Sequence, residues 1–258
     1  MTFFKYRRSM WAAIATLGLG FASTAQATPI TPDIIFGSGN ANGSFTVTTT
    51  PLSFPNNAIS GNIELGLRAK LRYDASGNPQ NQFNWDGVDT YTFNLANGNP
   101  PTNRAMWNYE WSVNVENLTA GSNQATISQL AGIGSLILSY DTDPGASTTF
   151  VDYNVFDFDA WYGTNTTANG GGIYDNTGTP VSGTTVAQNS VNYGFIPGAP
   201  LGAGLFGVKL TAFSSGGREL ASTGISVDVS PVPVPEPGTL ALLGLGLTGL
   251  VWVRRRRS

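Results

Sequence analysis

The sequence predicts an all-β protein whose body is an antiparallel β-sandwich, either jelly-roll or Ig-like. The first observation behind this prediction is a series of about ten short segments with strand-like patterns, separated by clusters of Gly, Asn, Pro and Asp. The second is composition: apolar residues make up 41 % and aromatic residues 11 %, whereas charged residues make up only 11 %. No segment of the body shows a sustained helical period, so we expect strands throughout it.

Two segments carry the strongest strand signals. Residues 63–73 alternate strictly between apolar and polar side chains, and residues 107–115 do the same. This period of two predicts one buried and one hydrated face for each strand, with Glu110 on the hydrated face. Residues 163–185 are rich in Gly, Asn and Thr, and we expect them to form a surface loop or part of a binding face. Weaker strands are predicted at residues 45–49, 90–95, 125–130, 135–140, 150–156, 186–196, 206–213 and 220–229.

Residues 1–27 have the pattern of a secretory signal peptide. Three basic residues stand near its start: Lys5, Arg7 and Arg8. Residues 10–22 are apolar, and Ala25 and Ala27 form a small-x-small cleavage site, which predicts a mature chain that begins at Thr28. A permanent membrane anchor is the alternative, but the apolar stretch is short and ends in a cleavage site.

The C-terminal residues have the pattern of a membrane stop. A Pro-rich linker at residues 231–237 precedes residues 238–253, which contain no charged side chain. A helix over this apolar stretch would span about 24 Å, which is short for a hydrocarbon core of about 30 Å. The last segment, residues 254–258, begins with Arg254, Arg255, Arg256 and Arg257. The positive-inside rule places these arginines in the cytoplasm, so both ends of the chain predict that the body, residues 28–230, lies outside it.

A specific resemblance is carried by the same C-terminal residues. Pro235, Glu236, Pro237 and Gly238, followed by the apolar stretch and the terminal arginines, resemble the PEP-CTERM sorting signal of Gram-negative bacteria that make extracellular polysaccharide. The resemblance implies a transient anchor in the inner membrane and processing near the Pro-Glu-Pro tripeptide by exosortase, a membrane-embedded cysteine protease-transpeptidase. It also implies release or transfer to the cell surface. The body is similar to PEP-CTERM proteins of unassigned function, and this similarity implies no activity.

Charge and missing residue types exclude several classes of function. The chain contains no Cys and no His, which excludes disulfides, argues against zinc sites, and removes the base of Ser-His-Asp and Cys-His catalysis. Without the three basic residues of the signal peptide and the four terminal arginines, 6 of the 13 basic residues remain against 16 acidic ones, a net charge of −10. Such a chain should repel nucleic acid and anionic lipid, so we expect no nucleic-acid partner.

Four aspartates are candidate calcium ligands: Asp141, Asp143, Asp157 and Asp159. Carboxylate oxygens on loops suit Ca²⁺, although the spacing matches neither an EF-hand nor an RTX repeat. The alternative is a hydrated acidic rim that keeps the protein soluble. We expect no other cofactor.

The aromatic residues Trp85, Trp161, Tyr162 and Tyr174 are candidate glycan contacts, because they stand in polar, loop-like surroundings. Their alternative role is to cap the ends of the core. A glycoside hydrolase would need two carboxylates about 5–10 Å apart, and no feature selects such a pair from Glu110, Glu116, Asp152 and Asp157. We therefore expect no catalytic residues.

Together these observations predict an exported cell-surface or extracellular-matrix protein that is not an enzyme. Its body is expected to be structural or to associate with extracellular polysaccharide. A carbohydrate-binding module is the alternative, and a secreted carbohydrate-active enzyme is the third hypothesis.

Overall fold

The computed structural model describes residues 34–37, 39–54 and 58–231. The predicted signal peptide, the sorting motif, the apolar stretch at residues 238–253 and the terminal arginines lie outside the described residues. Within the described ranges, no helix combines the length and the apolar character needed to cross a membrane.

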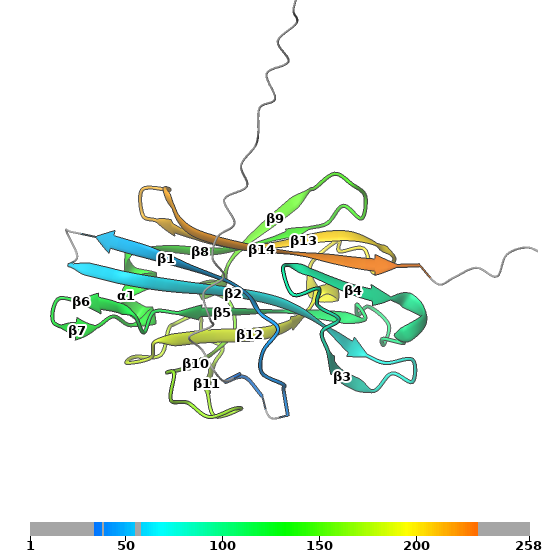
Figure 1. The fold of residues 1–258 in the computed structure, drawn as a ribbon, viewed down its shortest axis with the longest axis horizontal. Coiled ribbons are helices and arrows are strands. Elements are labelled where there is room, and N and C mark those ends of the chain that lie inside the picture. The colour runs from blue at the N-terminus through cyan, green and yellow to red at the C-terminus, as the bar shows by residue number, and fades with distance from the viewer. Residues whose placement is uncertain (1–33, 38, 55–57, 232–258) are drawn as a thin grey trace, which may run out of the picture.

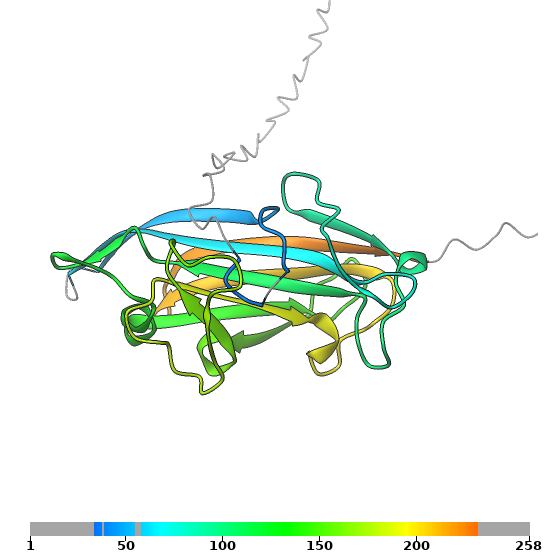
Figure 2. The ribbon, with the colours of Figure 1, turned by 90° about the horizontal axis from the view of Figure 1, so that it is seen from below.

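Two β-sheets form most of the described chain, and their long strands run along the longest axis of the body, so that loops gather at both ends (Figures 1 and 2). Over the described residues the larger sheet contains nine strands: β1 (Thr46–Phe54), β2 (Ile59–Tyr73), β3 (Pro79–Gln82), β5 (Trp107–Asn114), β6 (Leu118–Ala120), β7 (Asn123–Gln124), β10 (Ala160–Gly163), β11 (Ile173–Asp175) and β12 (Val186–Asn192). The smaller sheet, counted over the same residues, contains five: β4 (Thr90–Asn94), β8 (Gly134–Asp141), β9 (Phe150–Asn154), β13 (Gly204–Ser214) and β14 (Glu219–Ser230).

The larger sheet is organised around β2, which pairs antiparallel with β1, β3, β5 and β6 along its length. From β5 the sheet continues through β12 and β10 to β11. The smaller sheet has the order β4-β14-β13-β8-β9, and one of its pairs departs from the prediction because β4 runs parallel to β14. No hairpin turn joins these two strands, so no turn geometry imposes an antiparallel register.

One core fills the space between the two sheets. Leu65 and Leu67 of β2 contribute from the larger sheet, and Leu210 and Val227 contribute from the smaller one; all four are fully buried. This arrangement confirms an all-β body built from two sheets, and the choice between a jelly-roll and an Ig-like connection stays a prediction.

The strand predicted at residues 125–130 is wrong, because this segment enters the helix α1 (Ile127–Ile133). Thr126 and Gln129 form a capping box: the Thr126 side chain accepts a hydrogen bond from the Gln129 backbone, and the Gln129 side chain accepts one from the Thr126 backbone. These two bonds satisfy amide groups at the helix start, which stabilises a helix too short to show a helical period in the sequence.

The hydrated face predicted for β2 and β5 is also wrong, because both faces of these strands are buried. Arg68, Lys70 and Glu110 are at most 2 % exposed. Residues 34–37 and 39–45, which we call the N-terminal strap, lie across them: Arg68 donates a hydrogen bond to the Gly43 carbonyl, and Lys70 donates one to Asn40 Oδ1 at 2.7 Å. Strand alternation predicted which side chains share a face but not that another segment covers it.

The strap is held at its far end by segments distant in the sequence. The Ile35 amide donates to Gln188 Oε1 at 2.9 Å, and the Gly172 amide donates to the Ile35 carbonyl at 3.0 Å. A Cβ atom at Gly172 would lie 2.6 Å from that carbonyl oxygen, so only glycine permits this close approach. Part of the predicted 163–185 loop is therefore folded against the strap, and it includes the short strand β11.

Candidate functional site

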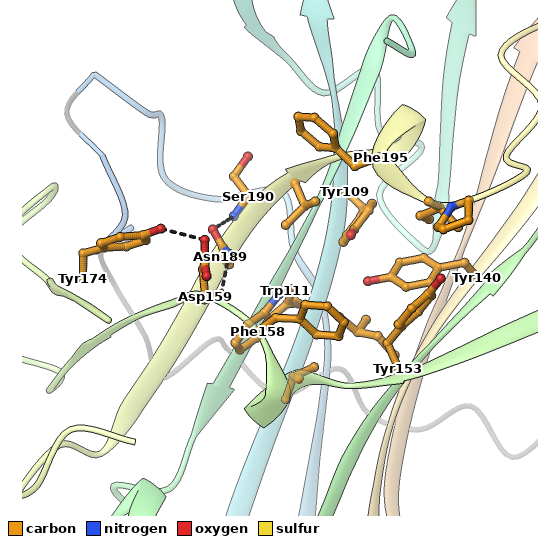
Figure 3. Close-up of a pocket in the computed structure, with 15 residues that line it drawn as sticks. Tyr109, Trp111, Tyr140, Tyr153, Phe158, Asp159, Tyr174, Asn189, Ser190 and Phe195 are labelled. Carbon is orange, nitrogen blue, oxygen red and sulfur yellow. Dashed lines mark hydrogen bonds between the residues drawn. The ribbon is translucent and has the colours of Figure 1, made fainter. Parts of the chain in front are cut away.

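A cleft of about 530 Å³ lies between β5 and β12 of the larger sheet and β8 and β9 of the smaller one (Figure 3). Fifteen residues line it: Tyr109, Trp111, Leu138, Tyr140, Tyr153, Val155, Phe158, Asp159, Tyr174, Asn189, Ser190, Val191, Phe195, Ile196 and Pro197. Strand β9 is the edge of the smaller sheet, whereas the larger sheet continues from β12 through β10 to β11.

A continuous series of aromatic rings leads from the core to the mouth of the cleft. The ring centroids of Tyr109 and Tyr140 are 4.6 Å apart, those of Tyr140 and Tyr153 are 5.7 Å apart, and those of Tyr153 and Phe158 are 5.5 Å apart. Tyr109 and Tyr140 are buried, whereas Phe158 is 50 % exposed. Tyr174 and Phe195, at 49 % and 56 % exposure, also line the cleft. Apolar rings therefore face water there, and a ligand that covered them would lower the free energy by removing this surface from water.

Two short 3-10 helices fix the exposed phenylalanines. In η3 (Val155–Asp157) the Asn154 side chain accepts a hydrogen bond from the Phe156 amide, and Val155 and Phe156 are buried just before Phe158. In η4 (Tyr193–Phe195) the Asn192 side chain accepts from the Gly194 amide. Phe158 therefore directly follows one capped turn and Phe195 ends the other, and both turns are anchored in the core.

The η4 turn is also fixed by close packing. Tyr193 is fully buried and stacks on Trp107 at a centroid distance of 4.4 Å. A Cβ atom at Gly194 would lie 2.6 Å from the Ala105 amide nitrogen, so this turn can approach the neighbouring chain only with glycine. The Phe195 ring projects from this rigid base, and the Arg104 guanidinium lies 4.1 Å from its centroid.

Polar groups meet at one end of the cleft, around Asp159. The Tyr174 hydroxyl donates to Asp159 Oδ2 at 2.6 Å, and Asn189 Nδ2 donates to the Asp159 carbonyl at 2.7 Å (Figure 3). The Ser190 amide donates to Asn189 Oδ1 at 2.7 Å, which fixes the orientation of the amide group. Trp161 is the cross-strand partner of Tyr174, and the ring centroids of the two residues are 5.2 Å apart.

Tyr109, Tyr140 and Tyr174 are neutral at physiological pH. Burial raises the pKa of Tyr109 and Tyr140 well above that of free tyrosine, and the hydrogen bond to Asp159 raises the pKa of Tyr174. Each of these hydroxyls therefore keeps its proton and can serve as a hydrogen-bond donor.

The predicted aromatic contacts have different places in the structure. Tyr174 lines the cleft, and Trp161 beside it is partly buried and is not a lining residue. Tyr162 is 1 % exposed, so its ring has no surface for a sugar and it is removed from the candidate set. Trp85 stacks on Tyr91 with ring centroids 6.3 Å apart and does not line the cleft.

The four candidate calcium ligands do not converge. Asp141 is buried, and its Oδ1 accepts hydrogen bonds from the Asp143 and Thr149 amides. Asp143 accepts from the Gly145 amide within the same loop, whereas Asp157 and Asp159 are exposed in the connection from β9 to β10. Among the described residues, no three acidic side chains are close enough to hold a metal ion together, and calcium binding stays a prediction.

The glutamates considered for catalysis have structural partners. Glu110 accepts a hydrogen bond from Arg68 Nε and forms an ion pair with Lys70. Glu116 Oε2 accepts from the Asn165 amide at 2.9 Å and from Thr185 Oγ1 at 3.0 Å. Burial alone would raise the pKa of Glu110, but the charges of Arg68 and Lys70 hold it below its usual value.

Sequence reasoning missed Phe158, Phe195 and Asn189 as cleft residues. Phe158 stands four residues after the cap residue Asn154 and outside the predicted strand 150–156. Phe195 stands three residues after the cap residue Asn192, near the end of the predicted strand 186–196. That pattern is a usable signal for an exposed ring on a rigid base. Asn189 lies inside a predicted strand, and nothing in the sequence shows that its face is left uncovered.

A comparison with protein families decides what the C-terminal residues are. A family model of the PEP-CTERM protein-sorting motif matches residues 233–257. The chain carries a PEP-CTERM sorting signal. This match confirms the predicted resemblance at Pro235, Glu236, Pro237 and Gly238 and includes Arg254, Arg255, Arg256 and Arg257.

The PEP-CTERM signal indicates a protein that is exported through the membrane to the cell surface and is processed by exosortase. The signal peptide, with its cleavage site at Ala25 and Ala27, and the transmembrane helix at residues 238–253 stay predictions. No curated protein matches the chain. The body outside residues 233–257 is therefore interpreted from its own geometry.

Proposed function

We propose that the exported body is a non-catalytic module that associates with extracellular polysaccharide and that the aromatic cleft is its contact site. The observation that carries this proposal is the group of half-exposed rings, Phe158, Tyr174 and Phe195, around the hydrogen-bonding groups of Asp159 and Asn189. The chain would then be sorted to the cell surface by its PEP-CTERM signal and would hold polysaccharide there.

The chemistry of a pyranose ring matches this arrangement. The C–H groups of a sugar form an apolar face that can stack on an aromatic ring, and removing both surfaces from water stabilises the contact. The sugar hydroxyls at the ring edge need donors and acceptors, which the Asp159 carboxylate, the Asn189 amide and the tyrosine hydroxyls supply. A cleft of about 530 Å³ has the size of a small-ligand site, and its open mouth would let a chain extend beyond it.

Binding is favoured over hydrolysis by the carboxylates of the cleft. Among the described residues that line it, Asp159 is the only acidic one, and its Oδ2 already accepts the Tyr174 hydroxyl proton. Retaining and inverting glycosidases use two carboxylates about 5–10 Å apart. We therefore propose a binding module rather than a carbohydrate-active enzyme.

Binding of a panel of polysaccharides and oligosaccharides to the processed protein tests the proposal. Phe195→Ala should weaken binding about three- to ten-fold, because one aromatic contact contributes about 0.5–1.5 kcal/mol to the binding free energy. Phe150→Ala is the matched control, because Phe150 is 46 % exposed but lies outside the cleft. Equal losses in the two variants, or no glycan bound by the wild type, would refute the proposal, and a purely structural role in the envelope would then be favoured.

A further inference from the structure

Negative charge collects at the Asp159 end of the cleft. Asp159 lines the cleft, and Asp157 is exposed two residues before it. Asp175 of β11 is the cross-strand partner of Ala160, the residue after Asp159. The pKa of Tyr174 is raised by its hydrogen bond to Asp159 and by the charges of Asp159 and Asp175. The negative charges of Asp159 and Asp175 are therefore felt at Tyr174, where a ligand in the cleft would bind.

Little positive charge is available to offset these carboxylates. No Lys or Arg is among the described residues that line the cleft. Residues 34–37, 39–54 and 58–231 contain 14 acidic and 6 basic side chains, and two of the basic ones, Arg68 and Lys70, are buried beneath the strap. Arg104 contacts the cleft residue Phe195, and its guanidinium lies against the ring.

We infer that the cleft selects uncharged glycan chains over carboxylated ones and that Asp159 is the residue that determines this selectivity. The inference rests on the proposed function, since it names the class of polysaccharide that the same site takes. A neutral sugar can donate a hydroxyl proton to Asp159, whose Oδ1 has no hydrogen bond within the described chain. A uronate has lost its acidic proton at neutral pH, so its carboxylate cannot donate and is repelled by Asp159.

The test uses two probes that differ only at C6 of the sugar, where one carries a neutral hydroxymethyl group and the other a carboxylate. The neutral glucan or other neutral oligosaccharide that binds best in the panel is compared with the same oligosaccharide oxidised at C6 to uronic acid. At about 0.02 M salt the oxidised probe should bind the wild type about three- to ten-fold more weakly, and at about 0.5 M salt the difference should fall to about two-fold, because salt screens exposed charges. A difference that does not change with salt would contradict charge selection.

Two variants then separate the charge of the cleft from the charge of the whole body. Asp159→Asn keeps an oxygen that accepts the Tyr174 hydroxyl proton but removes the charge, so the preference for the neutral probe should fall to within about two-fold. Asp228→Asn removes the same charge from β14, away from the cleft, and should keep the wild-type preference.

The outcomes distinguish the two claims. If no neutral probe binds, the proposed function fails and this inference fails with it. If the neutral probe binds through the cleft but the oxidised probe binds equally well, only the charge selection is overturned. If Asp228→Asn removes the preference as strongly as Asp159→Asn does, the selectivity comes from the overall charge and the role assigned to Asp159 is refuted.

Discussion

Beneath the N-terminal strap the larger sheet buries Arg68, Lys70 and Glu110, whereas at the cleft it leaves Tyr174 about half exposed. Both regions belong to the same sheet, and residue type alone would predict the opposite distribution. The difference lies in what covers each place: the strap lies across Arg68 and Lys70, whereas Tyr174 stands on β11, the last strand at that edge of the sheet. The comparison teaches that the covering segments decide where this sheet is a scaffold and where it is a surface for binding.

The buried charges of Arg68, Lys70 and Glu110 beneath the strap, which we call the covered region, stabilise the fold only while each has its partners. Glu110 pairs with both Arg68 and Lys70, and the strap supplies the Gly43 carbonyl and the Asn40 side chain as further acceptors. The Arg68 guanidinium also lies between two rings, 4.4 Å from the Phe45 centroid and 4.3 Å from that of Phe83. Buried charges are costly unless all of them are paired, so removing one partner should affect stability far more than a change at the cleft.

The largest effect is expected from Glu110→Gln, which leaves two buried cations without their counter-charge. We expect the free energy of unfolding to fall by about 3–5 kcal/mol, measured by urea denaturation of the processed protein. The matched control is Glu219→Gln, because Glu219 is about half exposed and lies 3.8 Å from Lys209. That change should lower the free energy of unfolding by less than about 1 kcal/mol. Equal losses in the two variants would show that the buried ion pairs contribute no more to stability than an exposed one.

The next effect concerns the anchor of the strap. Ile35 is 1 % exposed, and Ile35→Ala should lower the free energy of unfolding by about 2–4 kcal/mol through the cavity it creates. Hydrogen exchange at the Gly172 amide should accelerate, because its acceptor is the Ile35 carbonyl. Val88→Ala, at a side chain that is 63 % exposed, is the control and should change neither measurement appreciably.

Acid should weaken the buried ion pairs beneath the strap through protonation of Glu110. The pKa of Glu110 is lowered in the folded state, so the unfolded chain takes up a proton at a higher pH than the folded chain does. The stability due to Glu110 is therefore complete above its unfolded pKa of about 4.3 and is lost as the pH falls below it. Urea denaturation between about pH 6 and pH 3 should show a shallower acid loss for Glu110→Gln than for the wild type; parallel curves would contradict this assignment.

The smallest effect on stability is expected at the cleft. Phe195→Ala removes a ring that is 56 % exposed, so the free energy of unfolding should change by less than about 1 kcal/mol while glycan binding weakens. Thermal denaturation and binding of the same variant measure both quantities. A large loss of stability would indicate that the ring supports the fold instead of a ligand.

The sequence predicted the elements that have a regular pattern. The alternation at residues 63–73 and 107–115 identified β2 and β5, because side chains on opposite faces differ there in polarity. It also predicted hydration for Glu110, which is wrong because period two reports which residues share a face and not what lies over that face. Long-range coverage by the strap, from residues up to 153 positions away, leaves no local signal.

The candidate site was predicted only in part. Tyr174 was identified because an aromatic residue in a polar, glycine-rich segment has no core of its own to enter. Trp161 was identified by the same reasoning and packs beside Tyr174 as its cross-strand partner. Phe158 and Phe195 could not be assigned, because both lie at short turns after β9 and β12, and strand patterns carry no information about which strands meet around a cleft.

The position of the strap in the chain has a consequence for secretion. The strap follows the predicted signal peptide, so a chain exported from its N-terminus would bring the strap across the membrane before the rest of the body. The Ile35 amide, however, donates its hydrogen bond to Gln188, 153 residues later. The strap could then close over Arg68 and Lys70 only after most of the body had crossed as well.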